Sequence, residues 1–324
     1  MRDLDLRVMA QALEWAREGR TIWLCTVLAS YGSSPRAPGS LLVARDDGQY
    51  VGSLSGGCVE EDFIARLRDG AFTRPAAIQR YGETREESRR FALPCGGVLE
   101  ILIERRESDY AWRHHLEALY GALLGQKKLI RRVELDAGHY SLAPDEASQG
   151  ARTATAPGVA WIRIGPVLRL ILAGISPVAE ACAEFARALG YEVIVCDPRE
   201  QACADFAIEG VEVQPLLPSL FIASGACHTA TAVVALTHDP RIDDLAMIEA
   251  VRTPAFYIGV MGSRKTSDAR ATRLKRSGGL DDEDIARIRM PIGLDLGSKT
   301  PAEIALAVIA DVMRVHNGRS RDAL

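Results

Sequence analysis

The second half of the sequence alternates short apolar runs with helix-like segments, and this alternation constrains the fold more than any other feature. The runs are apolar throughout rather than at every second position, which is typical of strands buried on both faces of a sheet. Joined by helices, such strands predict a Rossmann-like, doubly wound parallel sheet. The expected strands are LRLILAG (168–174), YEVIVCD (191–197), GVEVQ (210–214), TAVVALTHD (231–239) and AFYIGVMGS (255–263).

The first half mixes helices and strands without that regular alternation, so we expect an N-terminal mixed α/β domain. Asp47-Gly48 is a hairpin turn signal between two apolar runs. At 324 residues the chain is long enough for two domains. Residues 138–165 are rich in Gly, Ala, Ser, Thr and Pro, which indicates a linker between a first domain (1–150) and a second (166–324).

Composition and charge argue against several classes of protein. The net charge is −4, and no Lys/Arg stripe alternates with aromatic residues, so nucleic-acid binding is not expected. No apolar run approaches the roughly 20 residues of a membrane span, and the amino terminus lacks the apolar core of a signal peptide. We therefore expect a cytoplasmic protein, in which an odd count of seven cysteines indicates free thiols.

The turn after the first strand of the second domain has the position of a dinucleotide-binding loop, but an altered sequence. Gly174 begins the turn, and Ser176-Pro177 stands where the second glycine of G-x-G-x-x-G/A is expected. Proline also removes one backbone donor. The turn therefore supports the fold more than nucleotide binding. Asp197, at the end of the next strand, suits a ribose hydroxyl or a cap of the following turn equally well.

Other candidate ligand groups follow later strands of this domain. His238 and Asp239 come after TAVVAL, at the carboxyl edge where open α/β sheets carry ligands. Gly262, Ser263, Arg264 and Lys265 form a second strand-to-helix junction in which backbone N–H groups and two cations suit phosphate. A helix entry with solvated charges is the alternative there.

The unusual features of the first domain are two Gly-Gly-Cys segments. Gly56 and Gly57 precede Cys58 at an expected helix start, and Cys95 precedes Gly96 and Gly97. A helix start stabilises a thiolate, and glycines let a ligand approach the backbone, so Cys58 is a candidate metal ligand or nucleophile. Cys25, Cys182 and Cys196 lie on apolar faces and are expected to pack as small hydrophobic residues. The pattern assigns no role to Cys203 or Cys227.

These segments resemble a known family. GSSPRAPGSLLV, GSLSGGCVEEDF and PCGGVLEILIE resemble the amino-terminal signature of the xanthine dehydrogenase accessory (XdhC/CoxI) family, and LTHDPRIDDLA, YIGVMGSRKT and PIGLDLGSKTPAEIALAVIA resemble its Rossmann domain. Members of that family are chaperones that bind molybdenum cofactor (molybdopterin) and hold it while a cysteine desulfurase supplies the terminal sulfur. They then pass it to a molybdenum hydroxylase such as xanthine dehydrogenase.

The resemblance implies roles for particular residues. Cys58 and Cys95 would be the thiols of the cofactor site, and Arg36 would face the same site. A soft thiolate suits molybdenum, and glycine N–H groups with an arginine suit a pterin phosphate. The resemblance leaves a homodimer open, and it implies an accessory factor rather than an enzyme.

One departure from the family pattern keeps alternatives open. Family members commonly carry G-A-G-H-V-G/A where this chain has Gly174 to Ala179 as GISPVA, which puts nucleotide binding in doubt. An NAD(P)-dependent oxidoreductase requires the intact glycine fingerprint. A thiol redox sensor, in which Cys58 and Cys95 form a disulfide, is the remaining alternative.

Overall fold

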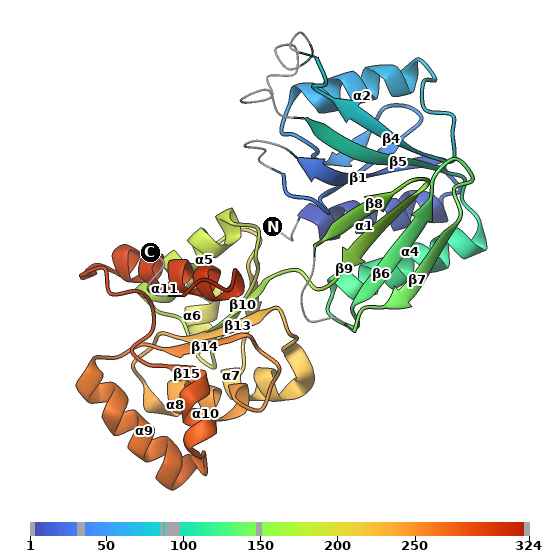
Figure 1. Cartoon of the computed structure of the whole chain (residues 1–324). Helices are drawn as coiled ribbons and strands as arrows, with labels where there is room; N and C mark the ends of the chain where they lie inside the picture. Colours follow the sequence, from blue (N-terminus) through green and yellow to red (C-terminus); the bar gives the residue numbers. More distant parts are fainter. Residues whose placement is uncertain (1–3, 31–35, 85–86, 88–97, 147–150, 321–324) are drawn as a thin grey trace. The chain divides into compact units, whose positions relative to one another are not determined.

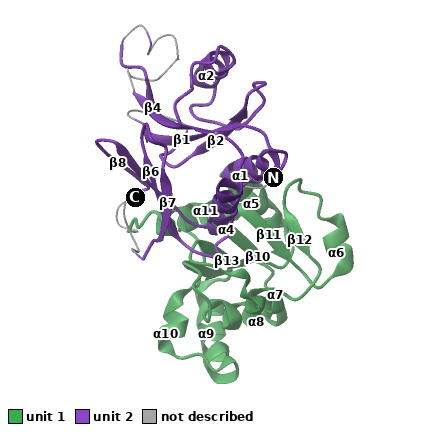
Figure 2. Cartoon of the chain, turned by 90° about the vertical axis from the view of Figure 1, so that its right-hand side faces the viewer, with its two compact units in different colours: residues 1–3, 167–324 green, residues 4–166 purple. Residues whose placement is uncertain are grey.

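The computed structural model describes residues 4–30, 36–84, 87, 98–146 and 151–320. They form two compact units, Leu4–Pro166 and Val167–Leu324 (Figure 2). The second unit begins one residue after the expected start at 166, but the first unit continues past the expected end at 150. The described part of residues 138–165 is not a linker: it contains three strands, β7 (Tyr140–Pro144), β8 (Thr153–Ala156) and β9 (Val159–Ile164), which pair within the first unit.

The second unit is the expected doubly wound parallel sheet, with strand order β12-β11-β10-β13-β14-β15. Every described pairing in it is parallel, as the uniformly apolar runs predict. The strands in that order are β12 (Glu212–Gln214), β11 (Glu192–Cys196), β10 (Arg169–Ala173), β13 (Thr231–Ala235), β14 (Tyr257–Val260) and β15 (Ile288–Arg289).

Helices cover both faces of this sheet (Figure 1). On one face, α5 (Pro177–Ala188) and α11 (Pro301–His316) share a buried apolar cluster with alternate strand residues. On the other, α8 (Pro240–Ala250) and α9 (Arg264–Gly278) contribute to a second cluster. The remaining helices are α6 (Glu200–Asp205), α7 (Pro218–Phe221), the π-helix η2 (Ile222–Ala226) and α10 (Asp282–Arg287). Two separate apolar faces require such a three-layer arrangement, in which each face excludes water.

The first unit contains two antiparallel sheets. The five-stranded sheet has the order β3-β2-β1-β5-β4, and the four-stranded sheet has the order β7-β6-β9-β8. The elements not yet given are α1 (Leu4–Arg17), β1 (Ile22–Ser30), β2 (Leu41–Arg45), β3 (Tyr50–Gly52), α2 (Cys58–Arg68), β4 (Ala76–Tyr81), β5 (Leu99–Arg106), α4 (Tyr110–Leu123) and β6 (Leu129–Glu134).

Helix α2 is fixed to the five-stranded sheet by its apolar side. Val59, Phe63, Ile64 and Leu67 are buried and join a cluster with inward residues of the sheet. Their spacing of three and four residues places them on one side of the helix. The first residue of α2 is Cys58, so this packing fixes the position of the candidate thiol.

A buried ion pair connects the two sheets of the first unit. Glu104 of β5 accepts hydrogen bonds of 2.5 and 2.7 Å from Arg131 of β6, and Arg106 donates to it as well. Arg131 also donates to His115 of α4 at 2.8 Å. Burial and the two neighbouring arginines lower the pKa of His115 to about 2, so the imidazole is neutral and accepts this bond.

Candidate functional site

The loop before Cys58 is organised around one carboxylate, that of Glu60. The side chain is 4% exposed, and its two oxygens accept six hydrogen bonds of 2.7 to 3.0 Å from residues 53–57. The donors are the hydroxyls of Ser53 and Ser55 and the backbone N–H groups of Leu54, Ser55, Gly56 and Gly57. Although burial alone would raise the pKa of Glu60, these hydrogen bonds lower it to about 2.

Sequence reasoning missed Glu60, although a signal for it exists. Gly57 is the N-cap residue of α2, and Glu60 stands three residues later. A glutamate in that position commonly reaches back to the N–H of the N-cap residue. Here it accepts from Gly57 at 3.0 Å and from five preceding groups as well. Its position therefore predicts the first contact, but not the wrapping of the whole loop around the carboxylate.

Cys58 is exposed at the first turn of α2, as expected. Apart from its two chain neighbours, no described residue has an atom within 4 Å of a side-chain carbon built on Gly57, so the described part of the chain leaves open space next to the residue before Cys58. Gly56 has a φ of 93°, in the left-handed region that favours glycine. The two glycines therefore serve different purposes: Gly56 makes the turn, and Gly57 leaves the approach to the thiol free.

Arg36 lies next to the same loop, but it is engaged in structural contacts. Its guanidinium donates to the carbonyl of Ser53 at 3.2 Å and to the carboxylate of Asp5 at 3.0 Å. Asp5 of α1 also accepts from the N–H of Leu41. Arg36 thus fastens the start of the loop to α1 and to the sheet.

The backbone donors expected to receive a pterin phosphate are used within the protein. The N–H groups of Gly56 and Gly57 both donate to Glu60. A phosphate at this position would lose those donors to the carboxylate and be repelled by its charge. The two amides that were expected to bind phosphate therefore already have an acceptor in Glu60.

The other cysteines divide as their positions indicate. Cys25, Cys182 and Cys196 are fully buried, and burial raises the pKa of each thiol. Cys203 and Cys227 are partly exposed, in the second unit. Cys95 and Gly96 lie outside the described residues. Among the described residues, no group of three His, Cys, Asp or Glu side chains is placed to hold a metal ion.

In the second unit, the turn after β10 is filled by side chains of the protein. A side-chain carbon on Gly174 would lie 2.0 Å from Cγ2 of Thr237, so the two loops at this edge touch. Ser176 caps α5 by accepting from Ala179 N, and its hydroxyl donates to the carbonyl of Leu236 at 2.9 Å. These contacts join the turns that follow β10 and β13, which is where the pyrophosphate lies in a dinucleotide-binding domain.

Asp197 has the local role that the sequence indicated as one of two possibilities. It is fully buried and accepts from Ile175 N at 2.7 Å and from the backbone and guanidinium of Arg199. Burial opposes ionisation, but the hydrogen bonds from Arg199 and Ile175 lower its pKa. The carboxylate therefore fastens two turns together, and its oxygens are already occupied by protein donors.

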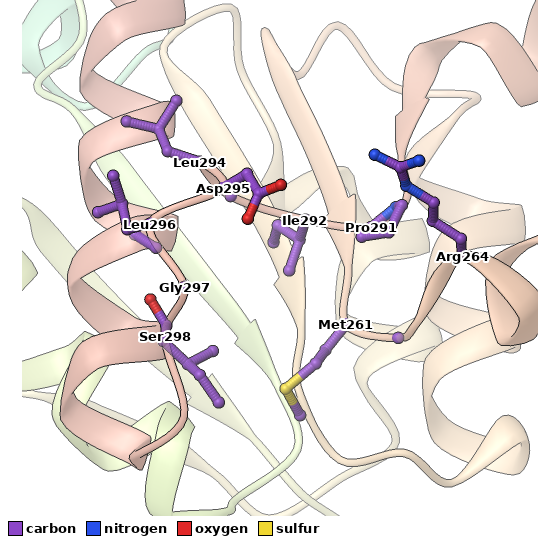
Figure 3. A pocket seen from close by; sticks show the side chains of 13 residues that line it. Met261, Arg264, Pro291, Ile292, Leu294, Asp295, Leu296, Gly297 and Ser298 are labelled. Carbon is purple, nitrogen blue, oxygen red and sulfur yellow. The ribbon is translucent and has the colours of Figure 1, made fainter.

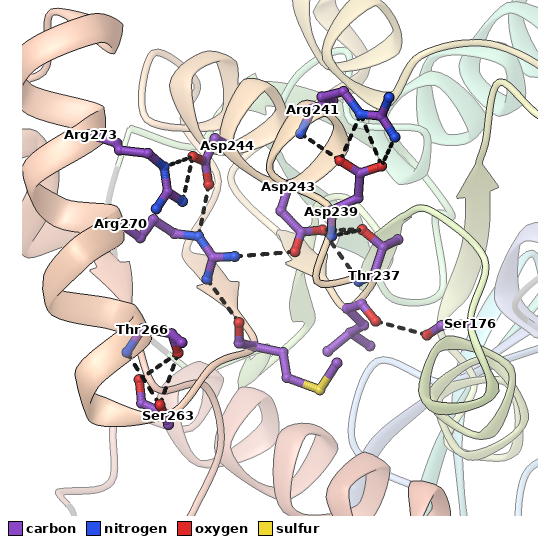
Figure 4. A network of polar contacts seen from close by, with 12 residues as sticks. Ser176, Thr237, Asp239, Arg241, Asp243, Asp244, Ser263, Thr266, Arg270 and Arg273 are labelled. Atoms are coloured by element: carbon purple, nitrogen blue, oxygen red, sulfur yellow. Dashed lines mark hydrogen bonds and ion pairs between the residues drawn. The ribbon is translucent and has the colours of Figure 1, made fainter.

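Most other charged groups at this edge are also paired with each other (Figure 4). Asp239 caps α8 and binds the guanidinium of Arg241, while buried Asp243 accepts from Thr237 and Arg270. His238 is exposed and has a φ of 65°, as a tight turn requires. Asp239 and Asp243 thus stabilise the helix start, and exposed His238 stands in the turn immediately before Asp239.

The junction at Gly262 opens into a pocket of about 420 Å³ (Figure 3). Gly262 and Arg264 line it, together with the loop that leads from β15 to α11. Ser263 caps α9 through Thr266 N, and Lys265 is not part of the lining. The structure thus brings two of the four residues expected here to one cavity and leaves the other two outside it.

Comparison with known proteins gives the family. Residues 15–82 match the XdhC and CoxI family, and residues 170–312 match the XdhC Rossmann domain. The chain belongs to the XdhC and CoxI family. Both regions described above, the loop at Cys58 and the edge at Gly174 and Gly262, lie within the matched segments of this XdhC-type protein.

Named relatives cover nearly the whole XdhC chain. It is 27% identical to the molybdenum cofactor insertion chaperone PaoD of Escherichia coli (strain K12), over 98% of this chain and 90% of PaoD. It is 25% identical to a probable xanthine dehydrogenase subunit of Bacillus subtilis (strain 168), over 90% of this chain and 92% of that protein. A solved structure described as a xanthine dehydrogenase from Bacillus halodurans aligns with a TM-score of 0.71 at 23% identity, over 100% of this chain and 98% of that one. This last likeness establishes the fold.

No helix among the described residues is both long and apolar enough to cross a membrane.

Proposed function

We propose that this protein binds molybdenum cofactor, holds it for sulfuration and inserts it into a molybdenum hydroxylase such as a xanthine dehydrogenase. The observation that carries the proposal is the exposed thiol of Cys58, next to a loop that is hydrogen-bonded to Glu60 and within the segment that matches the XdhC and CoxI family. Two relatives, one named as a cofactor insertion chaperone and one as part of a xanthine dehydrogenase, support it.

The geometry of the loop fits a temporary metal ligand. A thiolate is a soft ligand suited to molybdenum, and a single thiol is enough when the pterin supplies the other sulfur ligands. Glu60 and Arg36 hold the loop through hydrogen bonds, while no described residue beyond its chain neighbours lies within 4 Å of a side-chain carbon built on Gly57. The cofactor is cargo that must leave again, so one protein ligand serves release better than a closed cage.

The remaining parts of the proposal concern partners. A cysteine desulfurase supplies the terminal sulfur while the cofactor is held, and a cytoplasmic molybdenum hydroxylase receives it. In this scheme the chain acts as an accessory factor, alone or as a homodimer, and turns over no metabolite. Cys95 and Gly96 would complete the site around Cys58.

The central test replaces the thiol. We expect Cys58→Ala to lose most of the bound molybdenum, because the substitution removes the metal ligand and leaves the packing of α2 unchanged. The protein is purified without oxygen from a host that makes the cofactor, and molybdenum and pterin are assayed per chain together with the thermal midpoint. Wild-type protein should carry both.

A matched control comes from the second unit. Cys203 is partly exposed, and its thiol donates to the carbonyl of Asp197. Cys203→Ala should therefore retain wild-type molybdenum occupancy, and Cys95→Ala should lose as much as Cys58→Ala or less. Equal occupancy in wild type and Cys58→Ala, with both folded, would refute the proposed role of the thiol.

A further inference from the structure

The second unit contains a pocket that the cofactor chemistry does not use. It lies at the carboxyl edge of the parallel sheet, beyond β14 and β15, between the start of α9 and the loop that enters α11 (Figure 3). Its volume of about 420 Å³ falls in the range of pockets for small ligands. It is displaced from the crevice between β10 and β13, where the strand order reverses.

Part of the pocket lining is apolar, and this part is called the floor here. Met261, Ile292, Ile304 and Ala307 belong to it, while polar atoms predominate in the lining as a whole. Gly293 allows the loop to lie against α11, because a side-chain carbon there would come within 3.2 Å of the backbone of Ala307. The floor therefore combines residues from the end of β14, the loop after β15 and α11, and its apolar side chains can contact the ring of a ligand.

Two opposite charges stand at the rim without partners. Arg264 comes from the first turn of α9, and Asp295 comes from the loop before α11 (Figure 3). Among the described residues, neither side chain makes a hydrogen bond or an ion pair. At the same edge Asp197, Asp239, Asp243 and Asp244 are all paired with arginines. The contrast marks Arg264 and Asp295 as groups left available to a ligand.

We propose that this pocket binds a nucleoside phosphate. Arg264 and the backbone at the start of α9 receive the phosphate, since a guanidinium pairs with phosphate through two parallel hydrogen bonds and a helix start attracts anions. The base lies on the apolar floor, and Asp295 accepts from a hydroxyl or amino group of the nucleoside. The site stands apart from the altered turn at Gly174, and it does not depend on the role of Cys58.

The first test is calorimetric titration of the full chain with AMP, GMP, CMP and UMP, beside inorganic phosphate and ribose 5-phosphate. We expect at least one nucleotide to bind about tenfold or more tightly than inorganic phosphate, because the base contributes contacts that phosphate lacks. If inorganic phosphate or ribose 5-phosphate binds as tightly as every nucleotide, the assignment is overturned.

Two neighbouring cations provide a matched pair of variants. Arg264→Ala removes the pocket's guanidinium and should weaken nucleotide binding about tenfold or more. Lys265→Ala removes an equally exposed charge that does not line the pocket, and should change the affinity by about twofold or less. Equal losses in the two variants would show a diffuse attraction of anions to the helix start, and would overturn the placement.

A third variant tests the other end of the pocket. Asp295→Asn keeps the shape of the side chain but removes its charge and one acceptor. The ratio of nucleotide to phosphate affinity should fall about threefold or more, because the loss acts on the nucleoside contacts. An unchanged ratio would exclude Asp295 from the site. Because no measurement here involves molybdenum, the outcome is independent of the cofactor assay.

Discussion

Glu60 is the residue on which the geometry of the Cys58 loop depends most. Its charge is solvated inside the protein by six donors instead of by water. A carboxylate with a lowered pKa contributes stability that is fully present above its unfolded pKa of about 4.5 and is lost as the pH falls toward its folded value of about 2. This shift in the pKa of Glu60 corresponds to a contribution on the order of 3 kcal/mol to the free energy of unfolding.

We expect Glu60→Gln to lower the free energy of unfolding by about 2–4 kcal/mol at pH 7. In wild type the donors share two carboxylate oxygens, whereas the neutral amide of the variant offers them only one acceptor oxygen. The difference from wild type should shrink as the pH falls from about 5 to about 2, where wild type becomes protonated as well. Denaturant unfolding at several pH values measures it. Glu61, exposed on the same helix, is the control. A penalty that stays constant down to pH 2 would contradict the role given to the charge.

At the same scale, single residues differ in how far the sequence reveals them. The position of Cys58 at a helix start was predicted from two glycines and the helical pattern that follows, which are local features. The engagement of Gly56 and Gly57 by Glu60, and of Arg36 by Asp5, depends on how a loop curves and which helix lies beside it. Spacing along the chain carries little of that information.

The turn between β10 and α5 shows why an altered glycine fingerprint still keeps its first glycine. Gly174 has a φ of 89° and lies against the Thr237 methyl group of the turn after β13. The β-branched Thr237 cannot rotate away easily, and its hydroxyl is bonded to Asp243. Close approach of two loops therefore requires Gly174, whether or not a nucleotide binds.

Gly174→Ala should destabilise the second unit by about 2–4 kcal/mol, the sum of backbone strain and a steric overlap. Gly225 separates the two causes, since it has a φ of 88° but nothing within 4 Å of its side-chain position. Gly225→Ala should cost only about 1 kcal/mol. Equal losses in thermal or denaturant unfolding of the two variants would mean that contact with Thr237 is unimportant.

Among the elements, those with a clear apolar pattern were predicted from the sequence. Strands made of small residues, which lack such a pattern, were not. The strands β10 to β14 were predicted from apolar runs, and the helices α5, α8, α9 and α11 from the segments between and after these strands, whereas the two-residue strand β15 was not predicted. The strands β7 to β9 were mistaken for a linker because Thr153–Ala156 reads TATA and is mostly exposed. Its stability comes from pairing with Val159–Ile164, a contact that composition does not reveal.

At the scale of the whole chain, each unit has its own apolar core. The sheet of Val167–Leu324 is covered on both faces by its own helices, and Leu4–Pro166 buries a separate cluster beneath α2. A unit that buries its apolar surface internally meets the requirement for folding alone. A chain cut between the two units would therefore carry the thiol of Cys58 on one fragment and the pocket beside Arg264 on the other.

We predict that residues 167–324, produced alone, fold with a cooperative thermal transition and bind the same nucleoside phosphate as the full chain. The reason is that both the three-layer core and the pocket lining lie inside this segment. Gly174→Ala, placed in the fragment, should lower its thermal midpoint by on the order of 10 °C, and Arg264→Ala should leave it unchanged, because this exposed arginine has no partner among the described residues. Circular dichroism and calorimetry measure the two properties.

A fragment that shows no cooperative transition would mean that the core of Val167–Leu324 is insufficient alone. A folded fragment without nucleotide affinity would place the binding groups of the full chain elsewhere.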